Sequence, residues 1–202
     1  MSETSAPAEF TGFKSRLFWL MVIALVVLDL WTKSWAFSTL DEREIHWVAG
    51  SWLGFQRLLN PGGVFGIAQG ATTILTVIRI FAVGLLIWLA ARQLRSNRRG
   101  VFTLGLLTAG AIGNLYDNLG AFTGWADGSG HVRDFVRFDL GPAPSWIPEK
   151  IWLFDPWPIF NFADSCITIG FVLLLTGLGR VDWPHRSEAG NELEAKPKGE
   201  SR

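Results

Sequence analysis

Four long apolar stretches alternate with polar segments along the chain. Each approaches the length of about 20 mostly apolar residues that a membrane-spanning helix requires. The pattern predicts an all-α membrane protein with four transmembrane helices, at residues 17–37, 72–91, 101–119 and 159–178. The polar ends, residues 1–15 and 181–202, are expected to be tails of one membrane domain that covers residues 16–180.

The first apolar stretch has an alternative interpretation as a signal peptide. Lys14 and Arg16 precede twelve uninterrupted apolar residues, as in the charged and apolar regions of such peptides. However, no clear small-x-small cleavage site follows, and Asp29 and Lys33 continue the helical spacing. We therefore interpret the stretch as the first span.

Basic residues gather in three segments that flank the spans. They are Lys14 and Arg16, then Arg92, Arg95, Arg98 and Arg99, and finally Arg180, His185 and Arg186. Four spans place these segments on one side, which the positive-inside rule makes cytoplasmic. Both termini are then cytoplasmic, and residues 38–71 and 120–158 lie outside.

The composition supports a membrane protein and excludes several function classes. Charged residues form only 18% of the chain, against about 25% in soluble domains. Lys+Arg and Asp+Glu each number 18, so the chain has no net basic charge to hold nucleic acid. A single cysteine, Cys166, excludes an internal disulfide, and the three histidines show no metal-ligand spacing.

Polar side chains interrupt three of the spans on one side of the membrane. They are Asp29, Lys33, Asn114, Asp117, Asn118, Asn161 and Asp164. In the orientation above, all of them fall in the outer half of the bilayer. An ionisable group at that depth is costly and indicates a functional site. The alternative for the asparagines is that they only bind helices together.

Spacing arranges these polar residues on helix faces. Asn161 and Asp164 are three residues apart and are expected to share a face, with Asp164 roughly 8 Å below the start of its span. The polar residues of the third span are likewise three and four residues apart. Gly105, Ala109 and Gly113 form a stripe of small residues that permits close helix packing.

The outer segments differ from the spans. Residues 45–70 mix β-forming residues with glycine turns and predict a small extracytoplasmic β-cradle. Residues 130–140 are expected to be extended, with Asp134 between apolar neighbours, and we interpret Arg133 and Arg137 as exposed charges. Five prolines in residues 141–158 exclude a regular helix and predict an extended outer loop.

The chemistry that fits these residues is a pair of carboxylates. The chain lacks the GxSxG, HExxH and P-loop motifs, and Cys166 is expected to be a small core residue that points away from Asp164. Two carboxylates that share a proton can activate water, because one acts as base and the other as acid. Asp164 is the first candidate, and Asp117 and Asp134 both remain candidates for its partner.

Five short motifs resemble, in order, those of lipoprotein signal peptidases (signal peptidase II, also called prolipoprotein signal peptidase), a family of aspartic membrane peptidases. They are Asp29–Lys33 (DLWTK), Asn60–Gly66 (NPGGVFG), Gly113–Asp117 (GNLYD), Gly130–Phe135 (GHVRDF) and Phe160–Asp164 (FNFAD). Each motif is weak alone, but the five occur in the family's order and at the expected membrane positions. The resemblance covers roughly residues 15–180.

The resemblance implies an endopeptidase that removes the signal peptide from diacylglyceryl-modified prolipoproteins, cleaving just before the lipidated cysteine. The catalytic pair would be Asp134 and Asp164. The residues that orient dyad and substrate would be Asn60, Asn114 and Asn161, and those that support the framework would be Asp29, Lys33 and Asp117.

The same resemblance implies no metal and no cofactor. The expected partners are prolipoprotein substrates and membrane lipids, with no nucleic acid. The chain is expected to act as a monomer in the cytoplasmic (inner) membrane of a bacterium, with its active site near the outer face.

Two departures from the family pattern bear on the site. The family usually has an arginine that contacts the substrate where this chain has Asn118, so either activity is altered or another arginine reaches the site. Arg79, inside the second span, is our candidate, and its alternative is snorkelling to the outer interface. The outer segments near residues 120–129 and 137–157 are also longer than usual. A substrate-covering lid and a surface that selects particular lipoproteins both fit these insertions.

A second function from another class is a membrane protein that binds lipoproteins without cleaving them. A transporter subunit is disfavoured, because the spans show neither inverted repeats nor breaks at glycine or proline. The two functions differ in one observable feature. A working dyad requires Asp134 and Asp164 side by side, whereas in a scaffold each would pair with its own basic residue.

Overall fold

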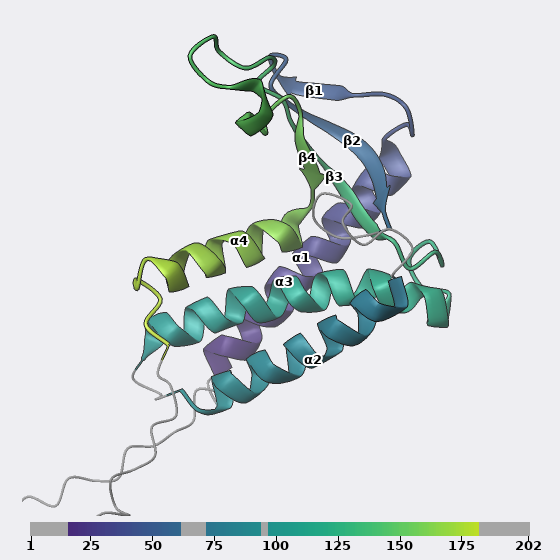
Figure 1. The fold of residues 1–202 in the computed structure, drawn as a ribbon. Coiled ribbons are helices and arrows are strands. Elements are labelled where there is room, and N and C mark those ends of the chain that lie inside the picture. The colour runs from purple at the N-terminus through teal and green to yellow at the C-terminus, as the bar shows by residue number, and fades with distance from the viewer. Residues whose placement is uncertain (1–15, 62–71, 94–96, 182–202) are drawn as a thin grey trace, which may run out of the picture.

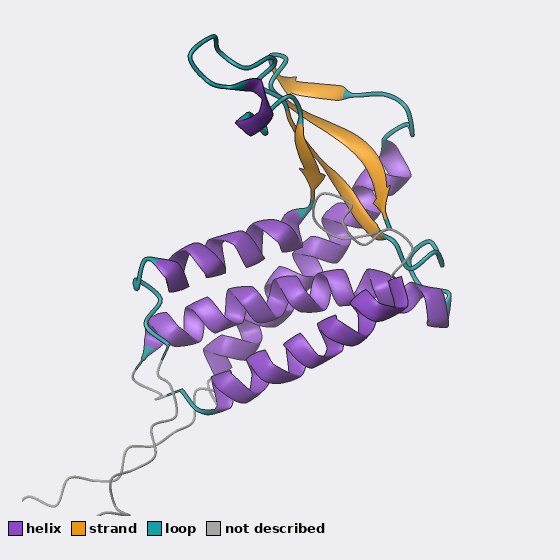
Figure 2. Cartoon of the chain, in the orientation of Figure 1, coloured by secondary structure: helices purple, strands orange, loops and turns teal. Residues whose placement is uncertain are grey.

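The computed structural model describes residues 16–61, 72–93 and 97–181. In these ranges four α-helices, a four-stranded antiparallel sheet and one short 3₁₀ helix follow one another (Figures 1 and 2). They are α1 (Arg16–Thr39), β1 (His46–Ala49), β2 (Leu53–Asn60), α2 (Thr72–Ala91), α3 (Arg98–Thr123), β3 (Val132–Phe138), η3 (Glu149–Ile151), β4 (Trp157–Phe160) and α4 (Phe162–Leu175).

α3 is the centre of the helix bundle, since α1, α2 and α4 all pack against it (Figure 1). The helix starts after Asn97, whose side chain accepts a hydrogen bond from the Gly100 backbone N–H. It ends at Gly124, which takes the left-handed conformation with φ of 73°. Because neighbours cover α3 on several sides, its polar residues are enclosed within the protein.

α1 and α2 are the helices of the described ranges that are long and apolar enough to cross a membrane. Both leave large apolar side chains uncovered, and Phe81 on α2 is 74% exposed. α3 carries buried polar side chains, and α4 has fourteen residues, roughly 21 Å at 1.5 Å per residue. The general prediction of a helical membrane protein with a small antiparallel sheet is therefore confirmed.

The sheet has the strand order β1-β2-β3-β4 and extends from the end of the bundle where α1 ends and α4 begins (Figure 1). In the β2–β3 pair, Leu58 lies opposite Asp134 and Asn60 lies opposite Val132. A buried cluster of Ala36, Leu40 and Phe135 packs α1 against the sheet. This packing fixes β3, and with it Asp134, relative to the helices.

The expected fourth stretch, 159–178, divides differently in the structure. Trp157–Phe160 pairs with β3 as a strand, and the helix starts only after Asn161, which caps it. Asp164 therefore lies in the first turn of α4. The sequence analysis had placed it deeper, roughly 8 Å below the start of its span.

The stripe of small residues on α3 packs against α1. A methyl group added at Gly113 would meet Cγ of Asp29 at 3.0 Å, and one added at Gly105 would collide with Cε of Met21. Ala109 is buried in the same contact. The glycines thus let α1 approach α3 closely and bring the polar ends of the two helices together.

Candidate active site

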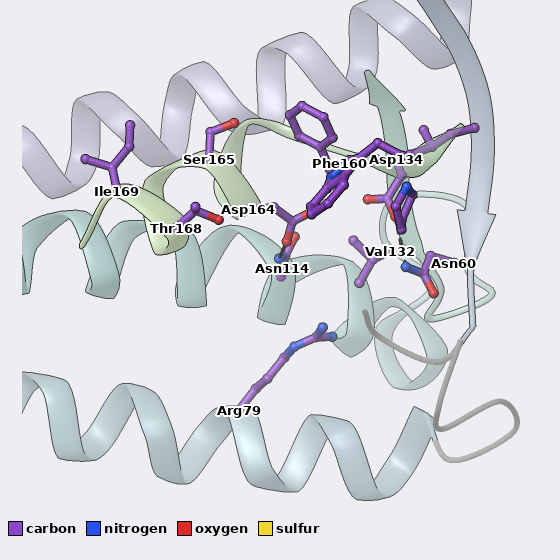
Figure 3. Close-up of a pocket in the computed structure, with 13 residues that line it drawn as sticks. Asn60, Arg79, Asn114, Val132, Asp134, Phe160, Asp164, Ser165, Thr168 and Ile169 are labelled. Atoms are coloured by element: carbon purple, nitrogen blue, oxygen red, sulfur yellow. Dashed lines mark hydrogen bonds between the residues drawn. The ribbon is translucent and has the colours of Figure 1, made fainter. Parts of the chain in front are cut away.

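A pocket of about 360 Å³ lies where β3, β4 and the first turns of α4 meet α2 and α3 (Figure 3). Among the described residues, the carboxylates that line it are Asp134 and Asp164. Its remaining lining residues are Asn60, Arg79, Asn114, Val132, Trp157, Pro158, Ile159, Phe160, Ser165, Thr168 and Ile169. A small polar group of residues therefore faces a largely apolar chamber, as is typical of binding sites.

Asp134 is held by two amide side chains. Its Oδ1 accepts a hydrogen bond of 2.7 Å from Nδ2 of Asn161, and its Oδ2 accepts one of 2.9 Å from Nδ2 of Asn60. Burial raises the pKa of Asp134 to about 7, and the negative charge of Asp164 acts in the same direction. The hydrogen bonds from the two asparagines oppose this rise in pKa only in part. Asp134 is therefore suited to exchange protons near neutral pH.

Asp164 is fixed by the start of α4. Its Oδ1 accepts a hydrogen bond of 2.8 Å from Nδ2 of Asn114, and its Oδ2 accepts one of 3.1 Å from the Asn161 backbone N–H. In return, Oδ1 of Asn161 accepts the Asp164 backbone N–H at 2.9 Å, which completes a capping box. The sequence analysis expected Asn161 and Asp164 to share one face of a helix. Their three-residue spacing instead reflects a helix cap.

Asn161 connects the two carboxylates. Its Nδ2 donates to Asp134 and, at 3.0 Å, to Oδ1 of Asn114, while its backbone N–H holds Asp164. Asn114 in turn donates to Asp164 and accepts a hydrogen bond of 3.0 Å from Nζ of Lys33. Both amide side chains have fixed orientations, because each donates and accepts at the same time.

A buried ion network lies next to this amide layer. Nζ of Lys33 lies 2.8 Å from Oδ2 of Asp29 and 3.0 Å from Oδ2 of Asp117. Oδ1 of Asp29 accepts a hydrogen bond of 2.8 Å from the Ala163 backbone N–H. The network therefore joins α1, α3 and the start of α4, directly beside Asp164.

The interpretation of Arg133 and Arg137 as exposed charges is wrong. Arg137 is only 18% exposed, and its Nη2 lies 2.9 Å from Oδ2 of Asp139. Arg133 bears more directly on the site. Its side chain is buried, and its Nη2 lies 2.8 Å from Oδ1 of Asp117. Its Nε donates to the same oxygen at 2.9 Å, and its backbone N–H donates to Oδ2 at 3.2 Å. Alternation along β3 turns Arg133 away from the pocket and Asp134 toward it. Asp117 thus has two basic partners and does not line the pocket, in contrast to Asp134.

Arg79 extends from α2 into the pocket (Figure 3). Its Nη1 donates a hydrogen bond to Oδ1 of Asn118, and Nδ2 of Asn118 donates to the Gly130 carbonyl at 2.7 Å. Within the described residues, no carboxylate lies at ion-pair distance from Arg79. The guanidinium is thus oriented by an amide and turned toward the carboxylates (Figure 3).

A second group of possible metal ligands lies outside this pocket. Asp41, Glu44 and His46 place their ligand atoms within 4.8 Å of one another on the surface beyond α1. The sequence analysis considered only the spacing of the histidines and did not foresee this group. Both acids are exposed, and such surface groups are common without an ion, so we assign it no role.

The comparisons with known proteins agree with one another. The family model described as Signal peptidase (SPase) II matches residues 21–179. A lipoprotein signal peptidase of Rhodopirellula baltica is 32% identical, over 95% of this chain and 85% of its own length. That of Rhodococcus jostii is 37% identical, over 85% of this chain and 77% of its own length.

Two solved structures of bacterial membrane enzymes have the same fold. One, at 2.3 Å resolution, has a TM-score of 0.66 and 24% identity, over 92% of this chain and 94% of its own. The other, at 1.9 Å resolution, has a TM-score of 0.62 and 28% identity, over 80% of this chain and 92% of its own. The sheet that extends from a helix bundle is thus shared with enzymes of the membrane.

Proposed function

Because this chain belongs to the signal peptidase II family of aspartic membrane peptidases, we propose that Asp134 and Asp164 are its catalytic pair. The carrying observation is that both carboxylates face one pocket and are held there by amide donors. The nearby basic side chains Lys33 and Arg133 are instead paired with Asp29 and Asp117. A scaffold in which each pocket carboxylate has its own basic partner does not match this arrangement.

The pair hydrolyses the peptide bond through an activated water. One carboxylate takes a proton from water, whose oxygen attacks the scissile carbonyl carbon, while the other carboxyl group donates its proton to the carbonyl oxygen. The tetrahedral gem-diol then collapses. Its C–N bond breaks as the carboxyl group that took the proton from water donates it to the departing nitrogen, and the other carboxylate regains a proton from a hydroxyl of the gem-diol. The raised pKa of Asp134 supports this scheme, because the pair keeps one shared proton near neutral pH.

The substrate is a prolipoprotein that carries diacylglycerol on the cysteine after the scissile bond. The pocket suits such a substrate, because both carboxylates share it with apolar side chains that include Trp157, Ile159 and Ile169. Asn114 and Asn161 orient the dyad through the contacts described above, and Asn60 holds the extended substrate backbone beside β2. The ion network of Asp29, Lys33 and Asp117 holds α1, α3 and the start of α4 together.

The protein crosses the membrane four times, with both termini in the cytoplasm. The sheet and the pocket lie at one end of the helices (Figure 1). The start of α1, the end of α2, the start of α3 and the end of α4 lie at the other, and these ends carry or adjoin Arg16, Arg92, Arg98, Arg99 and Arg180. The positive-inside rule places that second end in the cytoplasm. Acyl chains of the substrate then lie in the bilayer beside the bundle, and the chain acts as a monomer in the bacterial inner membrane.

The test is a gel-shift cleavage assay with a diacylglyceryl prolipoprotein and its unlipidated form. We expect lipid-dependent cleavage by the wild type and none by Asp134→Asn or Asp164→Asn. Glu42→Gln is the matched control, because Glu42 is an exposed carboxylate between α1 and β1, on the same side of the molecule and outside the pocket. Retained cleavage in either aspartate variant would rule out the dyad.

We further propose that Arg79 binds the substrate, with Asn118 as its positioning residue. Arg79 faces the dyad pocket without a carboxylate partner among the described residues, so its remaining N–H groups are available to a peptide carbonyl. Removing a donor that acts on developing charge costs about 100-fold or more in turnover. Arg79→Asn should therefore cleave at least about 100-fold more slowly than the wild type.

An exchange of the two residues tests position as well as charge. In the double variant Arg79→Asn/Asn118→Arg, the guanidinium comes from α3 and the amide from α2, so we expect much of the lost cleavage to return. Unchanged turnover and substrate affinity in Arg79→Ala would refute this role.

A further inference from the structure

The segment between β3 and β4, residues 139–156, is a folded projection. The Leu140 backbone N–H donates to the Phe154 carbonyl at 2.7 Å, and Nε1 of Trp152 donates to the Gly141 carbonyl at 2.7 Å. The ring of Phe154 stacks on Trp157 with centroids 5.1 Å apart and meets the edge of Trp152 at the same distance. These contacts close the base of the loop and give its outer residues a fixed place.

Three large apolar side chains of this projection are exposed. Trp146 is 79% exposed, Ile151 is 62% exposed and Leu153 is 46% exposed. Between them, η3 carries Glu149 and Lys150, which are also exposed. Tryptophan and aliphatic side chains with a few flanking charges are typical of segments at a membrane–water interface.

The fold directs this surface toward the membrane. Figure 1 shows that the sheet leaves the bundle at the start of α4 and that its far end bends back in the direction in which α4 runs. Figure 2 shows η3 at this far end. In this view the tip therefore lies level with the first half of α4 along the direction of the helices, and does not extend beyond the outer end of the bundle.

The apolar surface also continues from the projection onto the bundle. Trp157 and Ile159 of β4, at the base of the projection, line one pocket together with Ile169 of α4. Ile169 and its neighbour Phe171 are about half exposed on α4. If α4 crosses the bilayer as proposed above, the lipid around α4 also meets the base of the projection.

We propose that residues 139–156 form an interfacial anchor, with Trp146 and Ile151 inserted at the boundary between headgroups and acyl chains of the outer leaflet. The occupant of this apolar surface is the phospholipid bilayer itself. Glu149 and Lys150 stay at headgroup level, while the prolines and the closed base hold the tip rigid. Since β3 and β4 are paired, the anchor sets the depth of Asp134 relative to the membrane. This proposal rests on the membrane orientation given under the proposed function.

Site-directed spin labelling measures this depth. Cys166→Ala removes the native thiol, and single cysteines then replace Trp146, Ser129 or Phe171 in the full-length protein. Each labelled protein is placed in vesicles of phosphatidylethanolamine and phosphatidylglycerol, and collisions with oxygen and with a water-soluble nickel chelate are compared. Ser129 lies in the exposed turn after α3 and is the aqueous reference, while Phe171 on α4 is the reference in the hydrocarbon.

We expect the label at position 146 to be shielded from nickel relative to position 129 and less exposed to oxygen than position 171. A label at 146 that meets nickel as freely as the one at 129 would overturn the anchor while leaving the dyad intact. A label at 171 that is accessible to the nickel chelate would instead contradict the membrane orientation, and the anchor would then be refuted as well. The cleavage assay on the same samples tests the dyad separately and confirms that each labelled variant is folded.

Discussion

At the scale of single residues, the pH dependence of the enzyme follows from the surroundings of Asp134. Its carboxyl group is buried and lies near a second negative charge, so its pKa rises to about 7. The protonated form dominates below that value and is lost above it. We expect kcat/KM for the lipidated substrate to fall about tenfold per pH unit above about pH 7, because the dyad then lacks its acid.

The same shift in pKa affects stability. Between about pH 4 and pH 7 the folded protein holds a proton on Asp134 that the unfolded chain has released. The resulting stabilisation is complete below about pH 4 and is lost as the pH rises through about 7.

A pH–rate profile that stays flat from about pH 6 to about pH 9 would contradict the assignment of Asp134 to the dyad. Glu42→Gln, which changes an exposed carboxylate outside the pocket, should leave the falling limb in place.

Residue spacing identified Asp164 as one member of a catalytic carboxylate pair but could not identify the other member. Asp117 and Asp134 were equal candidates, because sequence spacing does not show which acid already has basic neighbours. The structure separates them: Asp117 is paired with Lys33 and Arg133, whereas Asp134 is held by amides in the pocket. Arg133 was misjudged for a related reason, since a charged residue in a short segment is most often exposed.

At the scale of helices and strands, the ion network around Lys33 decides whether α1 and α3 stay together. Lys33→Met leaves the carboxylates of Asp29 and Asp117 buried without this partner, which should cost about 3–5 kcal/mol of unfolding free energy. Thermal unfolding in detergent measures the loss. Glu42→Gln is the control, because Glu42 is 79% exposed and its 3.6 Å pair with Arg57 should contribute at most about 1 kcal/mol. Equal effects of the two substitutions would refute a supporting role of the network.

The contact between α3 and α4 gives a second prediction at this scale. A methyl group at Gly110 would collide with the Ala163 carbonyl and lie 2.7 Å from Cγ1 of Ile167. Gly110→Ala should therefore lower stability by about 1–3 kcal/mol and slow cleavage, because it displaces the turn that carries Asp164. Gly84→Ala is the matched control, since a methyl group there meets nothing within 4 Å. It should be neutral or add up to about 1 kcal/mol. Normal stability and activity of Gly110→Ala would show that this contact is looser than the structure indicates.

Helices and strands were predicted unequally well from the sequence. The first three apolar stretches lie within α1, α2 and α3, because long apolar runs are the strongest local signal, although α1 and α3 extend beyond their stretches at both ends. The start of α4 was misplaced, because Trp157–Phe160 is as apolar as the helix that follows it. The capping box at Asn161 and Asp164 was the signal that could have marked the boundary.

At the scale of the whole molecule, the sequence predicted a bundle and a cradle but not their arrangement. The central place of α3 depends on contacts among helices far apart in the chain, and apolar periodicity does not record them. The same holds for the sheet, in which the register of β2 and β3 brings Asn60 close to Asp134. The site thus combines local signals, such as the cap of α4, with distances that only the folded chain defines.

The proposed anchor makes catalysis depend on the bilayer as well as on the pocket. Trp146→Glu combined with Ile151→Glu places two charges at the tip, and the lost burial of one large apolar side chain alone is worth about 1.5–3 kcal/mol. We expect kcat/KM in vesicles to fall about tenfold, which corresponds to about 1.4 kcal/mol, and to change less than about twofold in detergent micelles, which offer no flat interface. Ser145→Glu is the control, because Ser145 is exposed next to Trp146 and contributes no apolar side chain. An equal loss of activity in micelles and vesicles would mean that the tip supports the fold or contacts the peptide, and does not hold the active site at the membrane surface.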